Sequence, residues 1–211
     1  GQISQYDVNK KSRQALNLGL GYRILSDDGS YFSGVNTFLD VDSEENYRAG
    51  VGFELRSSSF ELNGNYYNAL SGGVTVGDET NRALNGHDIT AVGQAPYLPW
   101  IDLSLSSYEW EAEQNSKNSK GEVYKGQFYL TKSLSIEAGI DDNNITLEDN
   151  FFRLTYVYPP KDRTTLQDGF ISNNAFENSD VRKEMLTKVK RSNKIVVEVE
   201  ASGVVISNGN S

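Results

Sequence analysis

The sequence predicts an all-β protein: a twelve-stranded antiparallel barrel of the kind that spans the bacterial outer membrane. Three observations point there: apolar and polar residues alternate along many short segments, aromatic residues mark segment ends, and connections alternate between short and long. The 211 residues include 12 Tyr, 9 Phe and 19 Gly, but 4 Pro and no Cys. Such a composition suits strands and tight turns better than helices. The length suits one domain.

The alternation has a period of two, which places successive side chains on opposite faces of a strand. In residues 14–25 one face carries Leu16, Leu18, Leu20 and Tyr22. In residues 47–57 the apolar face opposes a face of Arg48, Gly50, Gly52, Glu54 and Arg56. One face of each predicted strand is therefore apolar, and the other is charged or glycine-rich.

About twelve such segments can be counted, an even number, as single-chain bacterial barrels require. They cover residues 1–8, 14–25, 31–41, 47–57, 59–69, 87–97, 100–112, 121–131, 133–140, 145–158, 182–191 and 193–201. Short turns are expected near 26–30, 57–59, 98–100 and 131–133. Long polar loops are expected on the opposite side at 71–86 and 114–121.

One connection breaks this alternation of loop lengths. Residues 159–181 form a long segment on the side of the short turns. The stretch NSDVRKEML is compatible with a short helix, with Ser179 or Asp180 as its N-cap. We expect a short helix or an ordered loop there.

Charge and composition exclude several other classes of protein. The formal net charge of −9 argues against a nucleic-acid partner, because phosphate binding needs clustered basic residues. The one dense basic run, Lys188, Lys190 and Arg191, is interpreted as a solvated strand end. No run of 18 apolar residues, as a membrane-spanning helix would need, is present.

No chemical motif is strong enough to predict an enzyme. His87 is the single histidine, and it follows no G-x-S-x-G nucleophile elbow. The stretch DVDSEENYRAGV resembles a calcium loop at Asp40, Asp42 and Glu44 but has Glu45 where the loop requires glycine. We expect neither catalysis, nor a metal site, nor a cofactor.

The polar face of the strands has two explanations. In a soluble sandwich it would face water. In a membrane barrel it would line the lumen, and aromatic residues at strand ends, such as Tyr22, Tyr47 and Tyr66, favour the barrel because they form interfacial girdles. The lumen-facing candidates on this pattern are Arg23, Arg48, Glu54, Arg56, Glu137, Arg153 and Glu198.

Several segments, in order, resemble the inverse autotransporter β-domain of the intimin and invasin family. They are LNLGLGYR, GVNTFLDVDSEENYRAGVGFEL, LNGNYYNALSG, NGHDITAVGQAPYLP, SYEWEAE and VKRSNKIVVEV, the last resembling the closing strand. Within the second segment the positions that match the family are Asn36, Phe38, Asp40, Arg48, Gly50, Gly52 and Glu54. Asn36 and Asp40 thereby join the lumen-facing candidates. His87 departs from the family, which usually has an aromatic residue there.

The resemblance implies an outer-membrane anchor that carries a C-terminal passenger to the cell surface for adhesion. Residues 1–201 would form the barrel, and 202–211 would begin the linker to the passenger. That linker would thread the lumen through Ser202, Gly203, Val204, Val205, Ile206 and Ser207. Implied partners are outer-membrane lipid, the passenger, the barrel-insertion machinery and, through the passenger, a host-cell receptor. The alternative is a passive porin or transporter barrel, whose lumen would have a similar sequence.

Overall fold

A single antiparallel sheet dominates the computed structural model, which describes residues 1–8, 11–77, 79–114, 117–145, 147–201 and 204–208. Ten strands pair in chain order, with β5 next to β8. They are β1 (Gln2–Val8), β2 (Lys11–Leu25), β3 (Tyr31–Asp42), β4 (Tyr47–Ser57), β5 (Phe60–Ala69), β8 (Gly86–Ala95), β9 (Leu98–Trp110), β10 (Ser119–Tyr129), β11 (Leu134–Asn143) and β12 (Leu147–Tyr156). The predicted all-β antiparallel class is confirmed.

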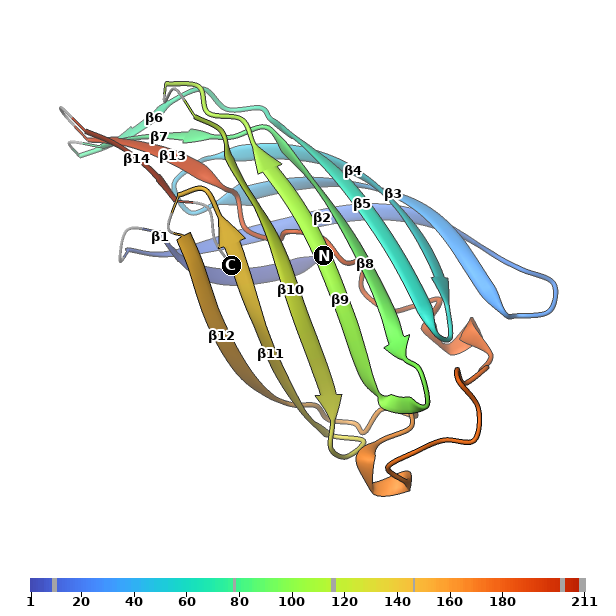
Figure 1. Cartoon of the computed structure of the whole chain (residues 1–211). Coiled ribbons are helices and arrows are strands. Elements are labelled where there is room, and N and C mark those ends of the chain that lie inside the picture. Colours follow the sequence, from blue (N-terminus) through green and yellow to red (C-terminus); the bar gives the residue numbers. More distant parts are fainter. Residues whose placement is uncertain (9–10, 78, 115–116, 146, 202–203, 209–211) are drawn as a thin grey trace.

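The sheet is strongly curved, and the C-terminal segment passes between its nearer and farther strands (Figure 1). Alternation assigns the two faces as the sequence predicts. On the outer face Leu20, Val51 and Leu103 are exposed, at 80%, 57% and 53% of their surface. On the inner face Asp40 and Arg48 are buried. A sheet with apolar side chains outside and charged side chains inside is the reverse of a soluble sandwich.

A smaller four-stranded sheet continues from one end of the main sheet (Figure 1). Its strands are β6 (Val74–Val76), β7 (Glu79–Ala83), β13 (Val197–Ala201) and β14 (Val204–Asn208), paired in the order β14-β13-β7-β6. The connection predicted as a polar loop at 71–86 therefore contains the hairpin β6–β7. Its residues have the β-branched composition of strands, with Val74, Thr75 and Val76 on one arm.

The end of the chain differs from the sequence prediction. Residues 182–191, expected as a strand, form the end of a 3₁₀ turn, η2 (Val181–Glu184), followed by irregular chain. Residues 193–201 contain only β13, which pairs with β7 and not with the main sheet. The turn predicted at 98–100 lies inside β9, and the chain reverses just before it. The carbonyls of Glu184, Met185 and Lys190 accept hydrogen bonds from side chains of the inner face, Arg23 and Asn65, instead of from a neighbouring strand.

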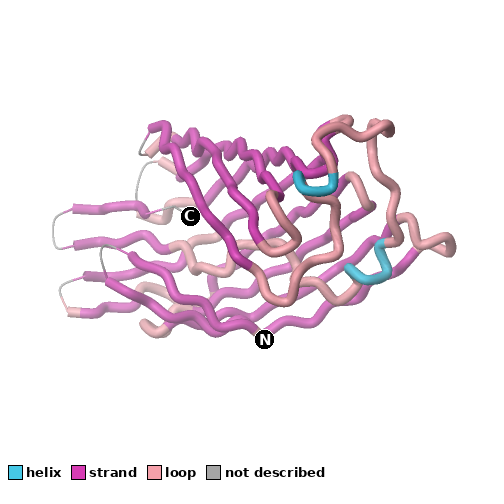
Figure 2. Tube along the Cα trace, turned by 90° about the horizontal axis from the view of Figure 1, so that it is seen from below, coloured by secondary structure: helices cyan, strands magenta, loops and turns pink. Residues whose placement is uncertain are grey.

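The expected short helix is present as that 3₁₀ turn. The side chain of Asp180 accepts a hydrogen bond from the backbone N–H of Arg182, as an N-cap does. A second 3₁₀ turn, η1 (Leu166–Asp168), precedes it. Figure 2 shows both turns at the same end of the strands. None of the helices described is long and apolar enough to cross a membrane.

The main sheet ends at β1 and β12, which are not paired with each other among the described residues. The pairing of β1 reaches from Gln2 opposite Asn17 to Val8 opposite Lys11, so it covers only the first part of β2. Closure of the sheet, and the number of twelve strands, stay predictions.

The turn between β2 and β3 offers a test of the local structure. Hydrogen bonds from the Ser26 hydroxyl, and then from the backbone and hydroxyl of Ser30, lower the pKa of Asp28 from 3.8 to about 2. The carboxylate therefore stabilises the turn above pH 4, and this contribution is lost as pH falls towards 2. An NMR titration of the Asp28 carboxyl should give a pKa near 2, and Asp28→Asn should increase amide exchange at Ser30. Equal exchange in Asp28→Asn and in the control Asp27→Asn would contradict this account.

Candidate functional site: the inner face and the segment that crosses it

The inner face is occupied by residues 185–196, which run from the end with the 3₁₀ turns to the end with the small sheet (Figure 1). The segment contains no helix or strand. Its backbone therefore cannot satisfy its own hydrogen bonds, and it needs partners wherever water is excluded.

Side chains of the inner face supply those partners. Four donate hydrogen bonds to carbonyls of the segment: Arg23 to Met185 (2.6 Å), Asn65 to Lys190 (3.1 Å), Arg48 to Ser192 (2.8 Å) and Asn17 to Asn193 (3.3 Å). Two tyrosine hydroxyls accept from its N–H groups: Tyr67 from Ser192 (2.8 Å) and Tyr6 from Ile195 (3.2 Å). Four strands, β1, β2, β4 and β5, thus bind one irregular segment through polar side chains.

Asp40, on β3, is the centre of this arrangement. Its carboxylate accepts hydrogen bonds from the guanidinium of Arg48 on β4 at 2.8 and 3.0 Å, and from the amide of Asn17 on β2 at 2.8 Å. It also accepts from both terminal nitrogens of Arg191, one of them at 3.0 Å. The side chains of Asp40, Arg48 and Arg191 are 0%, 0% and 2% exposed. One buried carboxylate therefore joins two buried guanidinium groups, one from the sheet and one from the crossing segment.

Aromatic rings complete the site of Arg191. Its guanidinium lies over the ring of Phe38 at 4.1 Å from the centroid, and that of Arg48 lies over the ring of Tyr67 at 4.4 Å. Cations are attracted to aromatic faces, most strongly where water is excluded. The ring of Phe38 lies where Gly19 has no side chain, since a Cβ built there would meet the ring at 2.3 Å. Gly19 is thus required for the close approach of Phe38.

Further ion pairs hold the segment where it enters. Arg56 bonds to Glu61 (2.5 Å) and to Glu184 (2.9 Å), and Lys190 bonds to Glu61 (2.6 Å). Between these contacts the segment is looser. A cavity of about 580 Å³ lies beside residues 185–189, and Asn36 and Glu54 of the inner face line it. The strongest attachment is therefore at 190–195.

The structure places the predicted lumen-facing residues in three groups. Those that face or contact the crossing segment or the cavity beside it are Arg23, Asn36, Asp40, Arg48, Glu54 and Arg56. Glu137 and Arg153 pair with each other at 3.0 Å on β11 and β12, and Arg153 is 61% exposed. Glu198 lies in β13, outside the main sheet.

For the linker predicted at 202–207, the structure differs most from the sequence prediction. Ser202 and Gly203 lie outside the described residues, and Val204, Val205, Ile206 and Ser207 belong to β14, where they pair with β13. The segment that lies against the inner face comes earlier in the chain. It was missed because Lys188, Lys190 and Arg191 were interpreted as a solvated strand end. Charge could have identified this segment: its basic residues Arg191 and Lys190 form ion pairs with the acidic inner residues Asp40 and Glu61.

One protein family matches most of the chain. Residues 1–193 match the family described as inverse autotransporter, beta-domain. The chain is 30% identical over 130 residues, 60% of its length, to the invasin of Yersinia enterocolitica, and the match covers 15% of that protein. A structure from a study of the in-meso crystallization of membrane proteins superimposes with a TM-score of 0.69. The superposition covers 94% of this chain and 91% of the other chain. The sequence identity is 18%, so the match supports the fold.

Removing the central charge tests the site. Asp40→Asn leaves the guanidinium groups of Arg48 and Arg191 buried without a counter-charge, which should lower the free energy of unfolding by about 3–5 kcal/mol. Urea unfolding in lipid vesicles, followed by fluorescence of the 2 tryptophans, measures this. Asp149→Asn, at an exposed aspartate of β12, is the control. Equal unfolding midpoints for the two variants would show that Asp40 does not hold the site together.

Proposed function

The chain belongs to the family of inverse autotransporter β-domains, and from this premise we propose that its curved sheet closes into a barrel whose lumen contains residues 185–196. As a member of that family it is an outer-membrane anchor and translocator of an adhesin, with the passenger at the cell surface. The observation that carries the proposal is the crossing segment itself, bound by buried polar side chains along the inner face.

The dimensions of the crossing segment fit a bilayer. Residues 185–196, extended at about 3.3 Å each, reach about 40 Å, more than the roughly 30 Å of a hydrocarbon core. The segment enters at the end with the short turns and leaves beside the longest connection between strands of the main sheet, which carries β6–β7. Outer-membrane barrels have short turns on the periplasmic side and long loops outside. The chain therefore crosses outwards, and whatever follows it emerges at the cell surface.

The chain spans a small part of the invasin that it matches, so the activity of a whole adhesin belongs to the proposal. We assign to these residues the holding and export of a C-terminal passenger. Adhesion to a host-cell receptor would be the work of that passenger. The barrel-insertion machinery would place the domain in the membrane, as it does other outer-membrane barrels.

A passive pore fits the structure less well. A pore needs an open lumen, whereas here the buried cluster of Asp40, Arg48 and Arg191 fixes a polypeptide across it. The proposal includes no catalytic step: His87, the single histidine, is exposed on β8, and no cofactor is needed to hold a chain.

Cysteine labelling of intact cells tests this function. The chain contains no Cys, so single replacements report unambiguously. Gly72→Cys, in the exposed connection before β6, should react with a membrane-impermeant maleimide from outside. Asp27→Cys, in the exposed turn between β2 and β3, should react only after the outer membrane is permeabilised. Labelling at Asp27→Cys alone in intact cells would invert the orientation, and equal labelling of both variants in intact cells would contradict a domain that spans the membrane.

A further inference from the structure

The crossing segment does not end free where it leaves the inner face. Residues Val197–Ala201 form β13, which pairs with β7 in antiparallel register from Val197 opposite Ala83 to Ala201 opposite Glu79. The N–H of Leu84 extends this ladder by donating to the carbonyl of Val196 at 2.9 Å. The segment thus passes from side-chain partners inside to a backbone partner outside.

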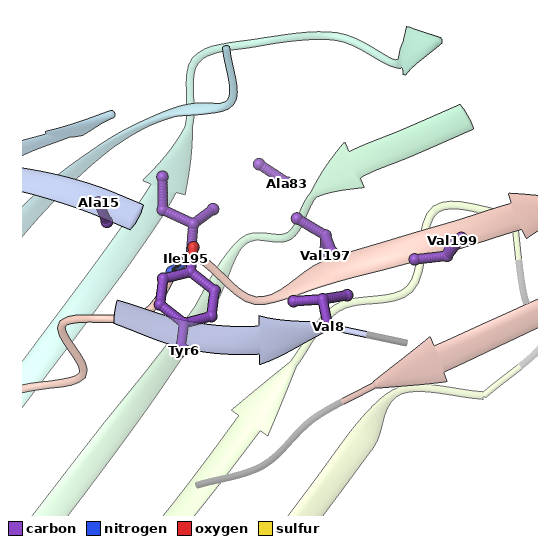
Figure 3. Close-up of a cluster of buried hydrophobic side chains, with 7 residues drawn as sticks. All are labelled: Tyr6, Val8, Ala15, Ala83, Ile195, Val197 and Val199. Carbon is purple, nitrogen blue, oxygen red and sulfur yellow. Dashed lines mark hydrogen bonds between the residues drawn. The ribbon is translucent and has the colours of Figure 1, made fainter. Parts of the chain in front are cut away.

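Both faces of β13 are covered. Val197 and Val199, 0% and 2% exposed, pack into a cluster with side chains of β1, β2 and β7 (Figure 3). The other members of this cluster are Tyr6, Val8, Ala15, Ala83 and Ile195. A strand that only extended the small sheet into solvent would keep these valine side chains exposed.

The opposite face carries a charged contact. Glu198 is 1% exposed, and its carboxylate accepts hydrogen bonds from the N–H groups of Glu113 at 3.1 Å and Gln114 at 3.0 Å. Both belong to the connection between β9 and β10. Carboxylate bonds to backbone N–H groups are stronger than neutral ones. A second surface connection, far from β7 in the sequence, therefore binds β13 from the other side.

The β7 side of this contact is itself fixed to the main sheet. Asn81, on β7, accepts a hydrogen bond from Arg13 on β2 at 2.9 Å and donates one to Glu44 at 3.0 Å. Arg13, 2% exposed, also bonds to Asp42 (3.3 Å) and to Glu44 (2.8 Å). Force applied to β13 is thus transmitted through β7 to the wall of the sheet.

We propose that β7 and residues Glu113 and Gln114, which follow β9, form an exit clamp, which captures residues 196–201 after they leave the lumen and holds them against outward pull. The inference rests on the proposed function for the direction in which the chain crosses. Ladder hydrogen bonds are perpendicular to their strands, so a pull along β13 loads the rungs together in shear. The clamp keeps tension on the exported polypeptide from reaching the contacts of Asp40 with Arg191.

Pulling on single molecules tests the clamp. The whole domain is placed in a lipid bilayer and pulled from a handle after Ser211. β14 lies between the handle and β13 along the chain, so the β13–β14 hairpin opens before anything else. Of the ruptures that follow, the first should be release of β13 from the clamp, and the second should be release of residues 185–195 from the inner face. Glu198→Ala should lower the force of the first rupture. Glu200→Ala, the next residue on the same face of β13 and only partly buried, is the matched control and should leave that force unchanged.

A disulfide provides a second, independent variant. Ala83 and Val197 are Cα partners, so Ala83→Cys with Val197→Cys should cross-link and abolish the first rupture until a reductant is added. Ala83→Cys with Val199→Cys, out of register, should cross-link far less. Equal first-rupture forces in Glu198→Ala, Glu200→Ala and the parent, or a first rupture that survives the in-register disulfide, would overturn the clamp. Loss of the second rupture alone would instead contradict the threaded lumen.

Discussion

One buried carboxylate holds the two parts of this molecule together. Asp40 binds Arg48 from the neighbouring strand and Arg191 from the crossing segment, and all three side chains are almost completely buried. Either guanidinium group would be very unfavourable there without the counter-charge. The crossing segment therefore depends on the sheet for the counter-charge of Arg191 as well as for its backbone hydrogen bonds. These contacts explain why irregular chain lies in the middle of an otherwise regular sheet.

Much of the main sheet could be predicted, because the sequence patterns that determine its strands and turns are local. Alternation with a period of two fixes the face of each side chain, so Val51 is exposed outside while Arg48 is buried inside. The turn at Asp28 is likewise encoded within five residues, by a carboxylate with serines on either side. For the same reason Arg23, Arg48, Glu54 and Arg56 could be assigned to the polar face of their strands before any of their partners were known.

The partners could not be predicted, because they lie far away in the sequence. Residues 182–191 were expected as a strand, and nothing in ten residues shows whether their carbonyls will bond to a strand or to side chains such as Arg23 and Asn65. The basic run was interpreted as a solvated end because Asp40 and Glu61 are more than a hundred residues away in the chain. The hairpin β6–β7 was hidden in a connection whose polarity suggested a loop, and its partner β13 comes more than a hundred residues later.

The account depends most directly on residues 185–196 filling the lumen of a closed barrel. The decisive measurement is the single-channel current in planar bilayers of the whole chain and of a chain ending at Tyr156, the last residue of β12, in the same salt. Heat-modifiable gel migration verifies that each is folded. The account predicts a nearly closed channel for the whole chain and a conductance several-fold higher for the shortened one. Equal conductance in two folded proteins would show that the segment does not occupy the lumen, and would contradict the central claim.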